Sequence, residues 1–279
     1  MHGRAGVRLD AAVGLPRRGV TGDAGWLAPE WRIAGVGALM TTRAGGVSSG
    51  PYASMNVGVA VGDDAATVAE NRRRFATRIG ARPVFLRQVH GARVVRVEAI
   101  DADPDRPLHE ADAVFTTAAG VACTVQAADC LPVLLAAPDG RAVGAAHAGW
   151  RGLAAGVLEA AVAAVSDAAR CQPSELSAWL GACIGPGAFE VGADVLLAFA
   201  VPPGSSADVA PAARHFRPQG AGKWLGDLAG LARDRLLAAG VQRVDGGGWC
   251  TVGDPARFFS YRRDGTTGRM AAAIWIARG

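Results

Sequence analysis

Charged and aromatic residues are scarce in this sequence. Of its 279 residues, 19% are Asp, Glu, Lys or Arg, 6% are aromatic and 50% are hydrophobic. The formal net charge is +4, and the first 28 residues contribute half of this excess, so the rest of the chain is close to neutral. Because nucleic-acid binding needs clustered basic residues, this composition excludes a dedicated nucleic-acid surface. It leaves ample apolar material for a well-buried core.

Cysteines and long apolar runs are equally sparse. The five cysteines have no paired spacing, which excludes a disulfide framework and favours a reducing cytoplasm. No apolar run approaches the ~18–20 residues that a membrane helix needs, and the first residues lack the apolar core of a secretory signal. We therefore expect a cytoplasmic protein with no membrane partner, as a monomer or a homodimer.

The apolar runs of the chain predict its strands. Several are apolar in succession rather than in alternation, which is typical of strands buried on both faces. The predicted strands are Ile33–Met40, Val84–Val89, Val94–Val97, Ala113–Thr116, Val121–Val125, Leu131–Ala136, Ala142–Ala146, Ala178–Ile184 and Met270–Ala277.

Helical periods follow between and after these strands. They predict helices at about 152–169, 191–200 and 225–239. Strands intermixed with helices predict an α/β or α+β sandwich. We expect one domain over residues 26–279, preceded by a loose Gly- and Arg-rich tail over residues 1–25. Residues 202–222 are expected to form a long surface loop.

Two histidines and a cysteine lie where predicted strands meet turns. His90 ends the run L-R-Q-V-H-G, His147 ends G-A-A-H-A-G, and Cys130 opens C-L-P-V-L-L. Side chains at strand ends often line a site, because the sheet fixes them while adjoining loops admit a ligand. His, Cys and His are also ligand types that hold catalytic zinc with an open fourth position. Their separations match no short zinc-finger spacing, so three packed side chains are the alternative.

Longer motifs occur in a fixed order along the chain. They are T-T-R-A-G-G-V-S-S-G-P-Y-A-S-M-N-V-G, E-N-R-R-R-F, R-Q-V-H-G, A-D-A-V-F-T-T, A-A-D-C-L-P-V-L-L, H-A-G-W-R-G, I-G-P-G-A-F-E-V-G and F-F-S-Y-R-R-D-G-T-T-G-R-M. Together they resemble the YfiH/YlmD family, known also as laccase-domain or polyphenol oxidoreductase-like proteins. The resemblance covers about residues 33–277.

The resemblance implies a fold, an activity and a metal site. The family's fold is a layered α/β sandwich around a mixed, largely buried sheet flanked by helices, related to the catalytic domain of cytotoxic necrotizing factor. Its members resemble purine nucleoside phosphorylases that also deaminate adenosine and cleave methylthioadenosine, and one is described as a peptidoglycan editing factor. The family's metal ligands fall here on His90, Cys130 and His147. This predicts zinc as the cofactor, with copper as the second candidate.

Phosphorolysis also needs a bound phosphate, for which arginines supply bidentate contacts. Arg43 in the T-T-R-A-G-G loop, Arg72 in E-N-R-R-R and Arg151 beside Trp150 are the predicted phosphate-binding residues. Each could instead be a turn, surface or bracing side chain. Asp129, next to Cys130, is a candidate catalytic acid or base, although adjacent residues on a strand point to opposite faces.

Other activities stay open beside this prediction. Cys130 with His147 as its base would form a thiol hydrolase that cleaves amide bonds, because metal-bound and nucleophilic thiolates use the same residues. A copper-loaded polyphenol oxidase fits less well, since multicopper oxidation needs several imidazole-rich sites and the chain has five histidines and no His-x-His pair. A purely structural zinc site is unnecessary in a chain of this size. We predict a zinc-dependent purine nucleoside phosphorylase that also deaminates adenosine.

Overall fold

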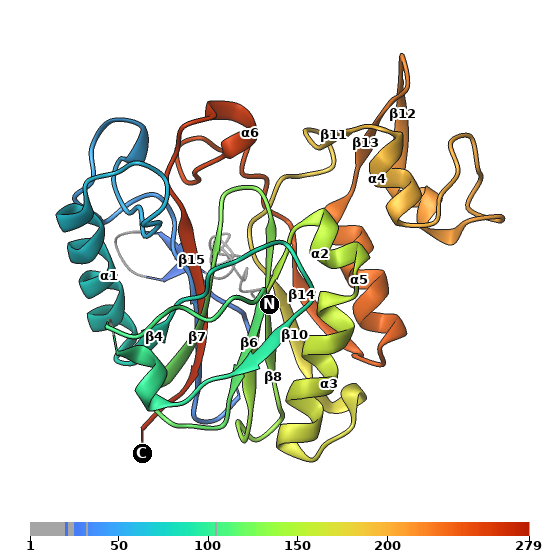
Figure 1. Cartoon of the computed structure of the whole chain (residues 1–279). Helices are drawn as coiled ribbons and strands as arrows, with labels where there is room; N and C mark the ends of the chain where they lie inside the picture. Colours follow the sequence, from blue (N-terminus) through green and yellow to red (C-terminus); the bar gives the residue numbers. More distant parts are fainter. Residues whose placement is uncertain (1–19, 22–24, 32, 104, 279) are drawn as a thin grey trace, which may run out of the picture.

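Two six-stranded sheets pack face to face at the centre of the protein (Figure 1). The computed structural model describes residues 20–21, 25–31, 33–103 and 105–278. The first sheet has the order β1-β2-β3-β15-β7-β4, and the second has the order β14-β10-β8-β9-β6-β5. Both are mixed, because β4 pairs parallel with β7 and β5 pairs parallel with β6 among antiparallel neighbours. A smaller sheet, β11-β13-β12, projects from this body (Figure 1).

The elements have the following bounds. The strands of the first sheet are β1 (Val20–Thr21), β2 (Trp26–Leu27), β3 (Val36–Met40), β15 (Met270–Ile276), β7 (Val121–Ala127) and β4 (Arg82–Val84). Those of the second are β14 (Arg243–Gly246), β10 (Ser177–Leu180), β8 (Leu131–Ala136), β9 (Val143–Ala148), β6 (Ala113–Thr116) and β5 (Val94–Arg96). The small sheet contains β11 (Glu190–Val191), β12 (Phe216–Gly220) and β13 (Lys223–Gly226). The helices are α1 (Ala65–Ile79), α2 (Trp150–Ala154), α3 (Val157–Ala169), α4 (Ala193–Ala198), α5 (Leu228–Ala238) and α6 (Tyr261–Asp264).

Helices cover the outer faces of both sheets. α1 buries Phe75 and Ile79 against the first sheet, while α3 and α5 pack together on the outer face of the second (Figure 1). A separate apolar layer fills the space between the sheets, with Leu134 from one and Ile274 from the other. The expected layered sandwich with a mixed, largely buried sheet flanked by helices is confirmed, with two such sheets at its centre. Within the described residues, no helix is both long and apolar enough to cross a bilayer.

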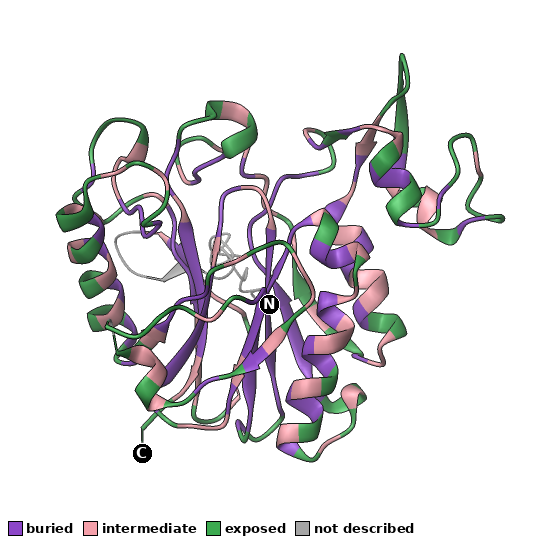
Figure 2. Ribbon diagram, viewed as in Figure 1, coloured by how far each residue is buried: buried purple, intermediate pink, exposed green. Residues whose placement is uncertain are grey.

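The central strands of the second sheet are covered on both faces. Every residue of β8 and β9 is buried, and Figure 2 shows that buried residues, in purple, are concentrated on the strands. This explains why their sequences are apolar in succession, since neither face of the strand meets water. Cys130 directly precedes β8 and His147 is the last residue but one of β9, so two of the candidate ligands lie at adjacent ends of these buried strands.

The predicted helix over residues 152–169 is divided in the structure. α2 ends at Ala154 and α3 begins at Val157. Gly156 between them has φ +93°, a left-handed conformation that glycine adopts without steric cost. The apolar period continues across this break, which is why the period alone predicted one helix. The predicted helices at 191–200 and 225–239 are present as the shorter α4 and α5.

The predicted strand Val84–Val89 is wrong over most of its length, because β4 ends at Val84. Beyond it, the side chain of Gln88 takes the place of a strand backbone. Its amide nitrogen donates to the carbonyl of Gln126 at 2.9 Å, and its amide oxygen accepts from the Gln126 N–H at 2.7 Å. The chain thereby leaves the sheet while its neighbour on β7 stays paired.

Two further predictions concern loop regions. Residues 202–222 are not one loop, because they include a short 3-10 helix, Pro211–His215, and the strand β12, whose hairpin partner is β13. The tail predicted over residues 1–25 lies mostly outside the described residues. Within it, Val20–Thr21 pairs antiparallel with Trp26–Leu27.

Candidate metal centre

His147 is the buried half of the candidate metal centre. It lies near the end of β9, opposite Pro132 of β8, and is 3% exposed. Its Nδ1 lies 2.9 Å from Oδ1 of Asp112, a carboxylate with no exposed surface. A carboxylate accepts and does not donate, so Nδ1 carries the proton and Nε2 is free to bind a ligand. This is the carboxylate–histidine arrangement that orients metal-binding imidazoles.

Asp112 also holds the turn that carries His90. Its two oxygens accept hydrogen bonds from the backbone amides of Val89, His90 and Gly91, at 3.1, 2.9 and 2.7 Å. His90 has φ +61°, a left-handed conformation that few non-glycine residues adopt. Three amides on one carboxylate stabilise this turn and direct the imidazole toward Cys130. One buried carboxylate therefore positions both histidines.

Cys130 completes the set. Its Sγ lies 3.8 Å from Nε2 of His90, and the rings of His90 and His147 meet edge to face with centroids 4.9 Å apart. One nitrogen or sulfur atom from each of the three residues lies within 4.8 Å of the other two. Gly149 leaves the necessary space, since a Cβ there would lie 2.9 Å from Cδ2 of His90 and 3.0 Å from Sγ of Cys130. The sequence prediction placed these three residues together, and the structure brings them together.

The electrostatics of the centre favour a thiolate. Burial opposes ionisation of Cys130, but the charge and hydrogen bonding of His147 and His90 outweigh it and lower the thiol pKa to about 6. Burial likewise opposes protonation of His147, yet the Cys130 thiolate and Asp112 raise its pKa. Thiolate sulfur and imidazole nitrogen are the donors that zinc and copper prefer. The chemistry of this donor set therefore fits zinc, which His90, Cys130 and His147 would hold.

A cavity of about 740 Å³ opens onto the three ligands. Its volume lies within the range of small-molecule sites. Apolar side chains such as Leu86, Leu108 and Val59 line part of it, and polar side chains line the rest, namely Arg87, Gln88, Gln126, Tyr261 and Arg269. The arrangement presents the candidate ligands His90, Cys130 and His147 to a space lined by both apolar and hydrogen-bonding side chains.

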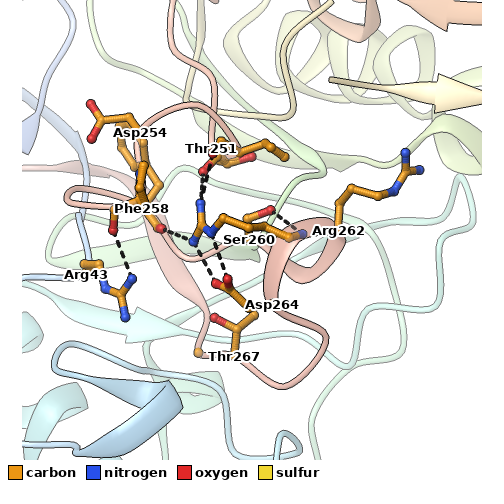
Figure 3. Close-up of polar contacts among 12 residues, drawn as sticks. Arg43, Thr251, Asp254, Phe258, Ser260, Arg262, Asp264 and Thr267 are labelled. Carbon is orange, nitrogen blue, oxygen red and sulfur yellow. Dashed lines mark hydrogen bonds and ion pairs between the residues drawn. The ribbon is translucent and has the colours of Figure 1, made fainter. Parts of the chain in front are cut away.

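Asp129 has a different surrounding from its neighbour Cys130. Its carboxylate accepts hydrogen bonds from the Thr251 hydroxyl and from the Arg262 backbone amide, and Asp129 does not line the cavity. The carboxylate thus ties the Cys130 turn to the segment that carries α6. Arg263 stabilises that segment further, donating to the carbonyls of Thr251 and Phe258 and pairing with Asp264 (Figure 3).

The three predicted phosphate-binding arginines are not brought to the cavity. Arg43 donates from Nε to the carbonyl of Ala53 and from Nη1 to that of Pro255, on the segment drawn in Figure 3. Arg72 donates to the carbonyl of Val57, and its guanidinium lies 3.8 Å from the ring centroid of Phe85. Arg151 is exposed and lies over the ring of Trp150. Their contacts are those of side chains that brace loops and helices.

Sequence reasoning gave no role to Asp112 or Arg269. Asp112 comes directly before the apolar run Ala113–Thr116, and a charge at the start of a buried strand is a signal that could have identified it. Arg269 is the last residue but one of the motif G-T-T-G-R-M, which gives no indication of the direction of its side chain. Its place in the cavity follows only from the tertiary structure.

Comparison with known proteins agrees with these observations. The chain matches the model of the family described as multi-copper polyphenol oxidoreductase laccase over residues 37–277. It is 50% identical over 253 residues to the purine nucleoside phosphorylase PA4543 of Pseudomonas aeruginosa, covering 90% of this chain and 98% of that one. It is 45% identical over 253 residues to the purine nucleoside phosphorylase YfiH of Escherichia coli, with the same coverage of 90% and 98%.

Solved structures show the same fold. The crystal structure of YlmD from Geobacillus stearothermophilus superposes with a TM-score of 0.84 at 36% identity, covering 94% of this chain and 100% of that one. Protein NMB0706 of Neisseria meningitidis gives a TM-score of 0.81 at 45% identity, covering 91% and 99%. The chain therefore belongs to the multi-copper polyphenol oxidoreductase laccase family, the YfiH/YlmD family that its motifs indicated.

Proposed function

We propose that this protein is a zinc-dependent purine nucleoside phosphorylase. The observation that carries the proposal is the convergence of His90, Cys130 and His147 on one wall of a cavity with the volume of a small-molecule site. The names of its relatives in Pseudomonas aeruginosa and Escherichia coli support the same activity. Adenosine, inosine and methylthioadenosine are the nucleosides we propose as substrates, with phosphate as the second substrate.

The reaction balances without a further co-reactant. An oxygen of hydrogen phosphate forms a bond to C1′ of the ribose while the bond from C1′ to N9 of the purine breaks. The purine keeps the bonding electron pair and takes the proton that the phosphate loses, so the products are the free base and ribose 1-phosphate. Side chains that line the cavity bind and orient these reactants. Among them, the Gln88 side chain is held by two hydrogen bonds to the backbone of Gln126.

Adenosine deamination is the proposed side activity. Water adds to C6 of the purine and ammonia leaves, so water replaces phosphate as the second reactant. Zinc, when bound by His90, Cys130 and His147, supplies positive charge that polarises a substrate oxygen or a water molecule. Asp112 keeps His147 in the tautomer that offers Nε2 to the ion. The remaining site predictions, Asp129 as an acid or base and Arg43, Arg72 and Arg151 as phosphate ligands, stay predictions.

A thiol hydrolase is the second candidate, because Cys130, His147 and Asp112 also form the sequence of contacts found in cysteine nucleophile triads. Such a protein would cleave amide bonds, as peptidoglycan editing requires. Metal content separates the candidates, since a thiolate bound to zinc is a poorer nucleophile. We favour zinc because His90 adds a third donor that a triad does not need.

Copper-dependent polyphenol oxidation is less well supported. Across the described residues, one group of three potential ligands was found, formed by His90, Cys130 and His147. Multicopper oxidation needs several copper ions at separate sites. Copper at this single centre would give weak oxidase activity beside the main reaction. We place the protein in the cytoplasm, where its free cysteines stay reduced, acting on small molecules rather than nucleic acid, as a monomer or homodimer.

The test is a product assay on protein with a measured metal content. Purified protein is incubated with inosine or adenosine, with and without phosphate, and the products are separated. Free base and ribose 1-phosphate that form only with phosphate support the proposal, and Cys130→Ala should lose metal and activity together. Cys171→Ala removes a thiol that is not part of the candidate metal centre, and this variant should keep both its metal and its activity. Absence of any purine product at every metal load would overturn the proposal.

A further inference from the structure

Arg269 has a built position inside the cavity. It directly precedes β15, its backbone amide donates to Oδ1 of Asn56 at 2.8 Å, and its carbonyl accepts from the amide of Val57 at 3.1 Å. Gly58 makes room for its side chain, since a Cβ at that glycine would lie 2.8 Å from Cγ of Arg269. The aliphatic part of Arg269 is therefore held in one place beside the metal ligands.

One nitrogen of the guanidinium is hydrogen-bonded to the protein, and its Cζ lies 5.9 Å from the ring centroid of Tyr261. Nη1 donates to the carbonyls of Thr267 and Gly268, each at 3.1 Å. Among the described residues, no hydrogen bond to Nε or Nη2 and no carboxylate paired with Arg269 is found. Nε and Nη2 form the edge with which arginine binds an oxyanion through two parallel hydrogen bonds. That edge belongs to a side chain that lines the cavity.

Arg269 differs from Arg87, the other arginine that lines the cavity, because among the described residues it has no salt-bridge partner. Arg87 pairs with Glu110 at 3.3 Å, and its side chain is 71% exposed, so its charge is both neutralised and solvated. Arg269 is half-buried, and burial lowers the pKa of its guanidinium. The charges of Cys130 and Asp129 act on this guanidinium through space, but among the described residues no carboxylate forms an ion pair with it. An anion from solution can therefore still restore the interactions lost on burial.

We propose that Arg269 binds the phosphate co-substrate in this cavity, through Nε and Nη2. The inference rests on the proposed phosphorylase activity and supplies the anion contact that the sequence prediction sought at Arg43, Arg72 and Arg151. Bound there, phosphate shares one cavity with His90, Cys130 and His147, so a nucleoside held by the same walls meets it directly. The recognised chemistry is a tetrahedral oxyanion, which could also be the 5′-phosphate of a nucleotide.

The test measures binding of inorganic phosphate to zinc-loaded protein by calorimetry. Charge-assisted hydrogen bonds contribute about 1.5–3 kcal/mol, so Arg269→Gln should weaken phosphate binding by about 10- to 100-fold. Arg87→Gln removes the same charge from the same wall and should change it by less than about twofold, since exposed ion pairs contribute little. Bound zinc and thermal unfolding are measured for both variants, and Arg269→Lys, which keeps the charge, should restore part of the affinity.

Two further measurements distinguish free phosphate from a nucleotide as the ligand, and the anion site from the proposed activity. Adenosine 5′-monophosphate replaces phosphate in one arm, and tighter binding of the nucleotide than of phosphate would overturn free phosphate as the ligand. In the other arm, Arg269→Gln should raise the KM for phosphate in inosine cleavage by at least about 10-fold. Unchanged phosphate affinity in folded Arg269→Gln overturns the inference even if inosine is cleaved. Phosphate binding through Arg269 without any nucleoside cleavage overturns the proposed function and leaves the anion site standing.

Discussion

The two histidines of the centre are held in opposite ways. His147 is buried at the end of a strand, and its imidazole bonds directly to Asp112. His90 is exposed on a turn in a left-handed conformation, and the same carboxylate holds its backbone rather than its ring. One candidate ligand is thus held by the sheet and the other by a loop, and the Asp112 carboxylate contacts both.

Removal of the Asp112 carboxylate should have the largest effect on zinc affinity and stability together, because it removes contacts to both His90 and His147. Asp112→Asn keeps the size of the side chain but loses one acceptor oxygen and the charge that orients His147. We expect zinc affinity to fall by about 10- to 100-fold and the free energy of unfolding to fall by about 3–5 kcal/mol. Competition with a chromophoric chelator and urea unfolding measure the two effects. Asp139→Asn, an exposed carboxylate paired with Arg141, is the control, and equal zinc affinity in both variants would contradict this role.

Removal of the buried histidine should have the next largest effect on stability. His147→Ala leaves a cavity and a buried Asp112 carboxylate that has lost its imidazole partner. We expect metal-free protein to lose about 2–4 kcal/mol of unfolding free energy, together with zinc binding. Urea unfolding of the metal-free variant checks this. A loss below about 0.5 kcal/mol, as for an ordinary surface substitution, would show that the strand-held half is not preorganised.

The exposed histidine should separate metal binding from stability. His90→Ala removes a ligand whose side chain contributes little to packing, and its turn keeps the three amide bonds to Asp112. Zinc binding should be lost, while the unfolding free energy of metal-free protein should change by less than about 0.5 kcal/mol. The same unfolding measurement, run beside His147→Ala, tests this. If both alanine variants are destabilised equally, the contrast between the two halves is wrong.

Substitution of a third histidine, His215, should have the smallest effect on stability, and it tests a carboxylate–histidine pair away from the candidate metal centre. Hydrogen bonding to Asp227 and Asp234 raises the pKa of His215. A raised pKa in the folded state gives stability that is full below about pH 6.5 and is lost as the pH rises through the folded value. We expect a loss of about 1 kcal/mol or less. Unfolding free energies from pH 5.5 to 9 should converge for wild type and His215→Gln as pH rises, and parallel curves would contradict it.

Much of the fold could be predicted from the sequence because its cause is local. Strands β8 and β9 are apolar in succession since both faces are covered, and this pattern is visible in the residues themselves. The break at Gly156 is less visible, because a glycine inside an apolar period signals a turn only when its φ is known. The strand predicted at Val84–Val89 failed because the Gln88 side chain replaces backbone pairing, which no period records.

The site was predictable only in part, for a related reason. His90, Cys130 and His147 follow from residue type and position at strand ends, and from motifs that resemble a known family. Asp112 and Arg269 act through tertiary contacts, the first by facing two turns and the second by its free guanidinium edge. The arginines chosen from loop composition have carbonyl and ring partners away from the cavity, which sequence spacing does not show.

We propose that the reaction depends on a metal ion held by His90, His147 and Cys130, and titration with zinc tests this directly. Metal-free protein is reloaded with increasing amounts of zinc, and the rate of inosine phosphorolysis is measured against zinc bound per chain. We expect no activity without metal and a linear rise in rate that ends at one zinc ion per chain. Full activity in metal-free protein would contradict it and would favour Cys130 as a nucleophile activated by His147.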